Sequence, residues 1–520
     1  MLRRYAFFLT LGLLFLVVIS FPYGFASLAA GPDYVFGGFL LNPLDGNSYL
    51  AKIYQGMAGS WTFRLPFTAD PGEGTYLILF YLALGHLARW FSLPNLTVFH
   101  LARLLGAAFL LWSLWRYFGA LFGDSRIRKT AFALAAFGSG MGWLLIATDA
   151  LTSDLWVAEI YPFLSSYANP HFPISLALML WLLMPPLDAP LSWGRGITLA
   201  AASLILSLLS PFGVVIVSLI LGVEFLIRFW TKSAPWRVFI RLLLVTLPGA
   251  PALLYDLWIV RVHPALAVWD AQNLTPSPPW WDTLISLSPA LALSGVAAWM
   301  MFRSRGRDFA PKTVSIPQWR PLLLWAGISL VLMYLPLGLQ RRFMMGLYIP
   351  LSGLAALGLE FLAGGRARRY RWLVVATFSL ALLTNLIVLA GGFVAASAQN
   401  PKIYLARDEW DALTWLDANA APNALVLSSP ETGLFIPAHT GRRVLYGHPY
   451  ETVNADAMEA AVTAFFDGTL TEAERQSLLN GYDVDLIFYG PRERDLGSIP
   501  VPEGWQPVFQ VGDVTIYGHR

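Results

Sequence analysis

Residues 196–230 read "GITLAAASLILSLLSPFGVVIVSLILGVEFLIRFW", an almost unbroken apolar run. A helix needs about 20 apolar residues to cross a bilayer, so this run is too long for a single crossing. It is interrupted at "LLSPFG" (208–213), where Pro211 is expected to force a tight hairpin because proline breaks a continuing helix. The stretch therefore predicts two consecutive membrane spans joined by a very short turn.

The composition of the whole chain agrees with this prediction. Of 520 residues, 56% are hydrophobic and only 13% are charged, whereas a soluble domain carries about 25% charged residues. This deficit indicates a chain that lies mostly in lipid. The net charge of +3 is too small to favour nucleic-acid binding. The lack of cysteine excludes disulfides and thiolate metal sites.

Further apolar runs of similar length predict an α-helical polytopic membrane protein with about eleven transmembrane helices. The runs begin around Tyr5, Val98, Thr130, Phe172, Gly196, Phe212, Val238, Thr283, Pro321, Met344 and Trp372. The first run follows Arg3 and Arg4 and is similar to a signal peptide, but its length and the later runs favour an uncleaved first span.

Basic residues set the expected orientation, because cytoplasmic loops are enriched in Lys and Arg. The basic segments that fall on the side of the N-terminus, predicted to be cytoplasmic, are 123–129, 192–196, 228–241, 302–312 and 364–371. This scheme requires that "GTYLILFYLALGHLARWF" (74–91) does not cross the membrane, so we expect an interfacial or re-entrant helix there. Outer segments are then expected at about 24–95, 148–171 and 261–282.

The composition changes after Ala396, where charged and turn-forming residues return at the density of a soluble domain. "ALVLSS" (424–429) and "DLIFYG" (485–490) are typical of buried strands, and "VFQVGDVTIYGH" (508–519) predicts a hairpin that turns at Gly512–Asp513. Amphipathic helices are predicted at 408–419, 455–468 and 471–482. We therefore expect a transmembrane module over residues 1–396 and an extracytoplasmic, soluble α/β domain over residues 397–520.

An acidic residue, Asp45, heads the short segment "DGNSYLAKIYQGM" (45–57) soon after the first predicted span. Helical spacing divides this segment into an apolar and a polar face. The two faces are Leu50, Ile53, Tyr54 and Met57, and Asp45, Ser48, Lys52 and Gln55. The pattern predicts an amphipathic helix that lies flat at the membrane surface. At its positive end, Asp45 could be a helix cap or an ionised base that accepts a hydroxyl proton, and the two roles are compatible.

The second outer segment carries Asp154, Glu159 and His171. These side chains are candidates for a second acid or base, a polar partner of the site or a metal ligand. Their spacing matches no metal-ligand rule, so solvated loop charges are the plainer interpretation and a divalent metal stays open.

Arg341 and Arg342 fall between two predicted spans on the outer side, against the positive-inside bias. Two arginines there need an anionic partner, which could be acidic lipid headgroups, a carboxylate, or the phosphate of a lipid-linked substrate. Arg261, His263 and Lys52 are further candidates for that phosphate. The sequence lacks the motifs GxxxxGK[ST], HExxH and GxSxG, and no GxGxxG opens a helix. This argues against a protein that is driven by a nucleotide bound on the cytoplasmic side.

The order of these elements resembles that of the GT-C superfamily of membrane glycosyltransferases. This superfamily includes protein mannosyltransferases, aminoarabinose transferases that modify lipid A, and oligosaccharyltransferases. The family has an Asp on a juxtamembrane helix, where this chain reads "PLDGNSYLAKIYQGM" (43–57), and then a partly inserted helix, here "PGEGTYLILFYLALGHL" (71–87). Residues 99–119 and 341–362 resemble the next span and a late span after an arginine. Some members also end in a soluble outer domain.

The resemblance implies a polyprenyl-phosphate sugar donor, Asp45 as the base that deprotonates the acceptor, and Arg341 or Arg342 as the holder of the donor phosphate. The chain departs from the family at Gly46, where many members have a second acid, and at "NPH" (169–171), where an acid is usual. We expect inverting sugar transfer to an acceptor at the outer face of the cell membrane. A transporter or flippase of a lipid-linked envelope intermediate and a non-enzymatic envelope protein are the alternatives.

Overall fold

The computed structural model describes residues 2–303, 316–336, 338–497 and 502–519. Most of the basic segment 302–312 and the side chains of Arg3 and Arg4 lie outside this description. The chain divides into two compact units, each made from segments that are distant in sequence. Unit 1 contains Met1–Pro22, His100–Tyr255 and Thr275–Gly392, and unit 2 contains Tyr23–Phe99, Asp256–Leu274 and Phe393–Arg520.

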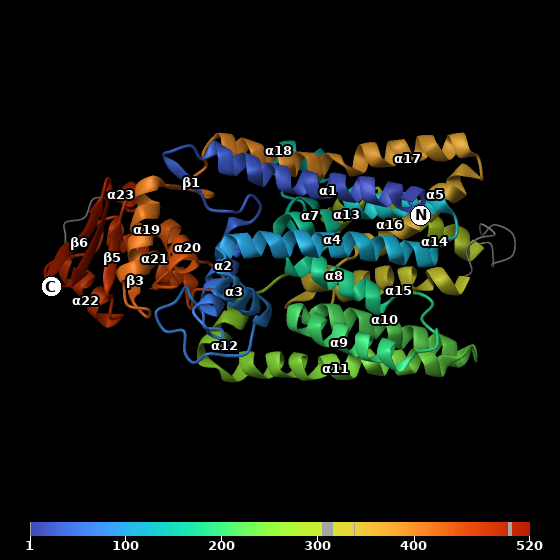
Figure 1. Cartoon of the computed structure of the whole chain (residues 1–520), viewed down its shortest axis with the longest axis horizontal. Helices are drawn as coiled ribbons and strands as arrows, with labels where there is room; N and C mark the ends of the chain where they lie inside the picture. Colours follow the sequence, from blue (N-terminus) through green and yellow to red (C-terminus); the bar gives the residue numbers. More distant parts are fainter. Residues whose placement is uncertain (1, 304–315, 337, 498–501, 520) are drawn as a thin grey trace. The chain divides into compact units, whose positions relative to one another are not determined.

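Unit 1 is built from helices. These, or the larger part of them, are α1 (Leu2–Ala29), α4 (Asn95–Leu121), α5 (Ser125–Phe137), η1 (Gly142–Thr148), α6 (Ser153–Trp156), α7 (Pro162–Ala168), α8 (His171–Leu182), α9 (Trp193–Leu209), α10 (Pro211–Trp230), α11 (Pro235–Val262), α13 (Trp280–Leu287), α14 (Ala290–Arg303), α15 (Ile316–Leu332), η2 (Gln340–Met344), α16 (Tyr348–Ala363), α17 (Ala367–Ala381) and α18 (Leu383–Ser397). Figure 1 shows α8, α9 and α10 side by side, and each of the three packs on the other two.

The apolar runs predicted from the sequence coincide with helices. Among the described residues, seven helical stretches are long and apolar enough to cross a membrane, α13 and α14 form a further pair bent by 87°, and three shorter apolar helices accompany them. Each predicted run falls on one of these stretches. The chain is therefore a multi-pass α-helical membrane protein by length and composition, and the number of crossings and their orientation stay predictions.

The predicted break at Pro211 is confirmed. Helix α9 ends at Leu209, Ser210 has an extended backbone with φ −158° and ψ 93°, and Pro211 is the first residue of α10. Proline suits this first position because its missing N–H would have no partner in the helix, and its fixed φ is already helical. A single residue therefore reverses the direction of the chain.

Helix α16 is the most buried of the candidate spans, with 83% of its apolar window inside the protein. A Cβ added at Gly358 would lie 2.2 Å from the carbonyl oxygen of Leu293, so only glycine allows this approach of α16 to α14. Small residues at such crossings are typical of helix packing in lipid, where close backbone contact replaces the hydrophobic driving force.

Unit 2 combines the first long loop with the C-terminal part of the chain. Its elements are β1 (Tyr34–Phe36), α2 (Pro43–Met57), α3 (Leu79–Phe91), α12 (Pro264–Gln272), β2 (Tyr404–Ala406), α19 (Arg407–Asn419), β3 (Leu425–Leu427), α20 (Pro430–Thr440), β4 (Arg443–Val444), α21 (Ala455–Phe466), α22 (Glu472–Gly481), β5 (Leu486–Tyr489), α23 (Pro491–Leu496), β6 (Trp505–Val511) and β7 (Val514–His519). The strands, the three helices and the hairpin predicted after Ala396 are confirmed.

A five-stranded mixed sheet of order β4-β3-β5-β7-β6 organises the C-terminal part. Strand β3 is parallel to β4 and β5, and β7 is antiparallel to β5 and β6. Successive strand residues point to opposite faces. Val426 accordingly packs with residues of α19 and α20, whereas Leu425 and Leu427 pack with residues of α21 and α22. Helices therefore cover both faces of the sheet.

Two pairings tie the first loop to this C-terminal part. Strands β1 and β2 form an antiparallel pair in which Val35 opposes Leu405. Helix α2 packs on α20 and on α3. A Cβ added at Gly85 would lie 2.0 Å from the carbonyl oxygen of Ile53, so α2 and α3 meet backbone to backbone. Helix α3, with 13 residues, is only about 20 Å long, which is too short to cross a bilayer, as predicted for this segment.

One interpretation of the segment 45–57 was wrong. Helix α2 begins at Pro43 with Asn42 as its N-cap, so Asp45 lies in the first turn and is not the cap. On the polar face of the helix, Ser48 and Lys52 are buried. The physical reason is that Pro43 starts the helix earlier and that the polar face has a partner from the distant C-terminal part.

Candidate active site

Helix α2 holds the first group of predicted site residues. Asp45 is half-buried in the first turn, and the side-chain Nδ2 of Asn42 donates a hydrogen bond of 2.5 Å to its Oδ2. The unpaired N–H groups of a helix N-terminus favour an ionised carboxylate. Asp45 is thus oriented by its neighbour and placed where its charged form is stabilised.

Lys52 and Ser48 lie further along the same helix and meet Glu451. The ammonium Nζ of Lys52 donates to Glu451 Oε1 at 2.6 Å and to Ser48 Oγ at 2.7 Å. The hydroxyl of Ser48 in turn donates to the same Glu451 oxygen at 2.6 Å. All three side chains are buried. The charge of Lys52 is therefore neutralised inside unit 2, and its predicted role toward a donor phosphate stays a prediction.

The short segment 447–452, "GHPYET", supplies this partner together with His448. Burial alone would raise the pKa of Glu451, but the charge of Lys52 and the hydrogen bonds from Lys52 and Ser48 hold that pKa below its usual value. Burial lowers the pKa of His448, so its ring is neutral. Its Nδ1 accepts from the backbone N–H of Tyr450 at 3.1 Å, so the proton is on Nε2. That Nε2 and Glu451 Oε2 have no hydrogen-bond partner among the described residues.

His263 serves as a link within unit 2. It caps α12 by accepting the N–H of Leu266 on Nδ1 at 3.2 Å, and its Nε2 lies 3.0 Å from the carbonyl oxygen of Glu73. Both ring nitrogens are therefore engaged. Arg261 is exposed in the last turn of α11, where the structure gives its guanidinium no ion pair among the described residues.

In unit 1 the structure brings Arg341 and Arg342 to the carboxylate of Glu159. Glu159 is buried, and its Oε1 lies 3.4 Å from Arg342 Nη1 and 3.7 Å from Arg341 Nε. The guanidinium of Arg341 lies 4.6 Å from the ring centroid of Trp156. Of the anionic partners considered for the two arginines, a carboxylate is present. Among the described residues, one carboxylate thus faces the two guanidinium groups.

Asp154 has other hydrogen-bond partners than these arginines. Its carboxylate accepts from the Thr152 hydroxyl at 2.7 Å and from the Gly142 N–H at 2.9 Å. Burial raises its pKa despite these hydrogen bonds. The preceding residue, Ser153, donates to the buried Asp282. Asp154 thus holds the local fold through one backbone and one side-chain hydrogen bond.

His171 opens α8, where its ring lies 4.0 Å from that of Phe172. Within the described ranges, no group of three or more His, Asp or Glu side chains is arranged to hold a metal ion.

His448 and Glu451 were missed at the sequence level. Segment 447–452 has a turn-like composition, and its contacts with α2 span 399 residues between Lys52 and Glu451. A local pattern carries no signal for such a distant pair. The only available hint was that a lysine and a serine share one face of α2 with Asp45.

Comparisons with known proteins place the fold. No protein-family model and no curated protein matches the chain. Among solved structures, it is similar to the archaeal oligosaccharyltransferase AglB from Archaeoglobus fulgidus, with a TM-score of 0.52 and 14% identity over 94% of this chain and 69% of that one. It is also similar to the arabinofuranosyltransferase AftD from Mycobacteria, with a TM-score of 0.52 and 14% identity over 97% of this chain and 41% of that one.

A third similar structure has nearly the same length. ArnT from Cupriavidus metallidurans matches with a TM-score of 0.50 and 12% identity over 96% of this chain and 97% of that one. At these identities the likeness concerns the fold. The resemblance drawn from the sequence is thus confirmed at that level: the chain has the GT-C fold of membrane glycosyltransferases.

Proposed function

We propose that the protein transfers a sugar from a polyprenyl-phosphate donor to an acceptor at the outer face of the cell membrane, with Asp45 as the general base. The observation that carries this proposal is the placement of Asp45 in the first turn of α2, oriented by Asn42 and stabilised in its charged form by the helix end. A carboxylate held in this way can accept a proton from a hydroxyl group.

The proposed reaction is a single inverting displacement. Asp45 takes the proton of the acceptor hydroxyl, and the acceptor oxygen forms a bond to the anomeric carbon from the side opposite the phosphate. The bond between that carbon and the phosphate oxygen breaks, and its electron pair leaves with the polyprenyl phosphate. Because this step builds negative charge on the leaving phosphate, the largest electrostatic demand is for cations at that group.

Arg341 and Arg342 are proposed to meet that demand. Their side chains retain 15% and 34% exposure, and both lie at a distance of 3.4–3.7 Å from the same oxygen of Glu159. An arginine binds a phosphate through parallel N–H donors, which makes it better suited than lysine to this task.

The structural neighbours support a transfer of this class. Two of them are an oligosaccharyltransferase, solved in complex with an inhibitory peptide and a dolichol-phosphate, and an arabinofuranosyltransferase. A lipid-linked donor would also explain a chain without a nucleotide-binding motif.

The test is Asp45→Asn in the full chain, reconstituted with radiolabelled polyprenyl-phosphate mannose, glucose or arabinose and an envelope extract as acceptor. We expect the variant to lose transfer by a factor of about 10² or more, because a general base contributes about 10²–10⁴. Glu73→Gln, which removes an exposed carboxylate from the same loop, should keep wild-type activity. Unchanged transfer by Asp45→Asn would overturn the assignment of the base.

The alternatives give different outcomes in the same membranes. A flippase would move a labelled lipid-linked sugar across vesicles with Asp45→Asn as well as with the wild type, and would transfer no sugar. A non-enzymatic protein would show neither activity, and Asp45→Ala would only lower its stability by about 0.3–1 kcal/mol, the usual effect of an acidic residue in the first turn of a helix.

A further inference from the structure

A cluster of arginines lies in unit 1 where the end of α10 meets the beginnings of α9 and α11 and the loop before α9. We define this helix-end cluster as Arg195, Arg228, Arg237, Arg241, Arg320, Asp188 and Glu224. Five guanidinium groups face two carboxylates, so the cluster carries a net charge of +3. Ion pairs and a hydrogen bond join Arg228, Arg320 and Arg237 to the two carboxylate residues. The guanidinium of Arg241 bonds to the carbonyl oxygen of Met184, in the loop before α9.

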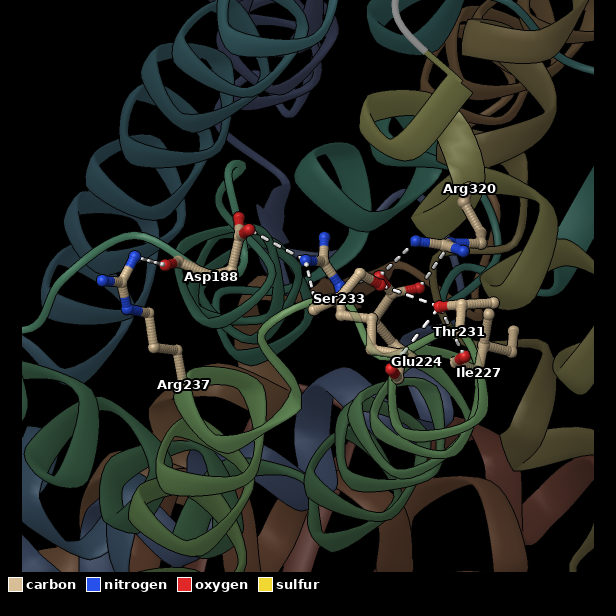
Figure 2. A network of polar contacts seen from close by, with 8 residues as sticks. Asp188, Glu224, Ile227, Thr231, Ser233, Arg237 and Arg320 are labelled. Carbon is tan, nitrogen blue, oxygen red and sulfur yellow. Dashed lines mark hydrogen bonds and ion pairs between the residues drawn. The ribbon is translucent and has the colours of Figure 1, made fainter.

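Both carboxylates are already engaged. Figure 2 shows the network around Glu224 and Asp188. Glu224 is fully buried and pairs with Arg228 at 2.6 Å and with Arg320 at 2.7 Å. Asp188 Oδ2 pairs with Arg228 Nη1 at 2.8 Å. These contacts neutralise two of the five arginines and leave no carboxylate of the cluster for the others.

Arg241 is the least compensated member. Its side chain is buried, with 1% of the residue exposed, and only its Nη1 has a hydrogen bond, to the carbonyl oxygen of Met184 at 3.1 Å. Its Nε and Nη2 have no hydrogen-bond partner among the described residues. A buried guanidinium with unpaired N–H groups is strongly destabilising unless an anion accepts them.

Two further arginines stand near this unpaired group. Arg195 is close enough to act on Arg241 electrostatically. Arg237 is exposed and lies beside Asp188, as Figure 2 shows, but its guanidinium reaches only the main-chain oxygen of Asp188 at 3.5 Å. Neither has an ion pair with a carboxylate among the described residues. The three therefore offer donors to one anion from outside the protein.

The position of the cluster fits the headgroup level of a membrane. Arg241 is six residues after the start of α11, a rise of about 9 Å. Trp193, Trp230 and Trp236 stand at the same helix ends and are 91%, 79% and 62% exposed. Exposed tryptophans at the ends of membrane helices are typical of the interface between lipid tails and headgroups. The anion available at that depth is a lipid phosphate.

We propose that Arg195, Arg237 and Arg241 bind the phosphate of an anionic membrane phospholipid of the phosphatidylglycerol class. A phosphodiester accepts the parallel N–H donors of a guanidinium. A zwitterionic lipid is disfavoured because its own cation would enter an environment that already has a surplus of positive charge. This site does not depend on the proposed sugar transfer and would act as a lipid anchor between α9, α10 and α11.

The test is native mass spectrometry of the full chain released from detergent after equilibration with defined lipids. We expect retention of phosphatidylglycerol and little retention of phosphatidylcholine. Arg241→Gln and Arg195→Gln should each weaken retention by about fivefold, the usual effect of one basic residue at a lipid surface. The matched control Arg369→Gln removes an exposed arginine from α17 and should bind like the wild type.

Three results would overturn the proposal. Retention of phosphatidylcholine equal to that of phosphatidylglycerol would show that the site does not distinguish lipids by the charge of the headgroup. Undiminished retention in both Arg241→Gln and Arg195→Gln would place the lipid elsewhere. Retention of polyprenyl phosphate, competed by inorganic phosphate, without retention of phosphatidylglycerol would assign the arginines to a different phosphate. Because Arg195 is only partly buried, Arg195→Gln keeps the test valid if Arg241→Gln fails to fold.

Discussion

The ammonium of Lys52 lies 2.6 Å from the Glu451 carboxylate, so two residues 399 positions apart share one buried ion pair. This pair fixes α2 against the segment 447–452, and Asp45 lies on the same helix two turns before Lys52. The geometry of the proposed base therefore depends on the C-terminal part of the chain.

Removal of one member of this pair should be costly. Glu451→Gln leaves the Lys52 ammonium buried without its counter-ion, and we expect a loss of about 3–5 kcal/mol in the free energy of unfolding. The double variant Lys52→Met/Glu451→Leu removes both charges and should lose less than the sum of the single changes. Chemical denaturation of the purified chain measures the free energy of unfolding of each variant. Additive losses would show that the two side chains are not coupled.

The stability of unit 2 should fall in mild acid because of His439. Burial lowers the pKa of this residue to about 4, whereas an unfolded histidine has a pKa near 6.5. Below pH 6.5 the unfolded chain binds a proton that the folded chain does not, so stability is present above that pH and is lost as the pH falls toward 4. At pH 5 the loss should be about 2 kcal/mol.

Unfolding midpoints between pH 7.5 and pH 4.5 test this prediction. His439→Leu should flatten the pH dependence by that amount, since it removes the titrating ring that lies against Trp410 and Phe435. His448 contributes in the same direction, because burial also lowers its pKa. An unchanged slope in His439→Leu would contradict the prediction.

The charge balance at Glu159 should control phosphate affinity. Arg342→Gln removes a charged donor and should weaken the binding of polyprenyl phosphate about tenfold. Glu159→Gln removes the carboxylate that holds the two arginines and should strengthen binding. Equilibrium binding of labelled polyprenyl phosphate measures both, with Arg116→Gln as an exposed-arginine control. If Glu159→Gln weakens binding as Arg342→Gln does, Glu159 positions the arginines and does not compete with the phosphate.

Two glycines that differ only in their surroundings test the packing of α14 on α16. Gly358→Ala brings a Cβ to 2.2 Å from a backbone oxygen and should lower the stability by about 1–3 kcal/mol. Gly295→Ala meets nothing within 4 Å and should be neutral or stabilising, because alanine has the higher helix propensity. Equal thermal shifts in the two variants would contradict the close approach of the helices.

The features that were predictable from the sequence have local causes. The turn at Pro211, the strands around Val426 and Ile487, and the hairpin at Gly512–Asp513 each follow from the residues in one short window. Helix α2 shows where local reasoning stops. Its start at Pro43 follows the preference of proline for the first helical position, and this preference places the cap at Asn42 and not at Asp45.

The burial of Ser48 and Lys52 could not be predicted in the same way. An amphipathic pattern shows which face is polar, but it does not show whether water or another part of the protein satisfies that face. Here Glu451 satisfies it. The same holds for strand β1, whose partner is β2.

The antiparallel pair of β1 and β2 has a consequence for the order of events during synthesis. Val35 leaves the ribosome long before its partner Leu405. At about 5–20 residues per second, the interval is on the order of 20–70 s. During this interval the edge of β1 has no partner strand and Lys52 has no Glu451 to pair with, because the helices between them are still entering the bilayer. The loop that carries Asp45 therefore reaches its final structure only in the last steps of synthesis and folding.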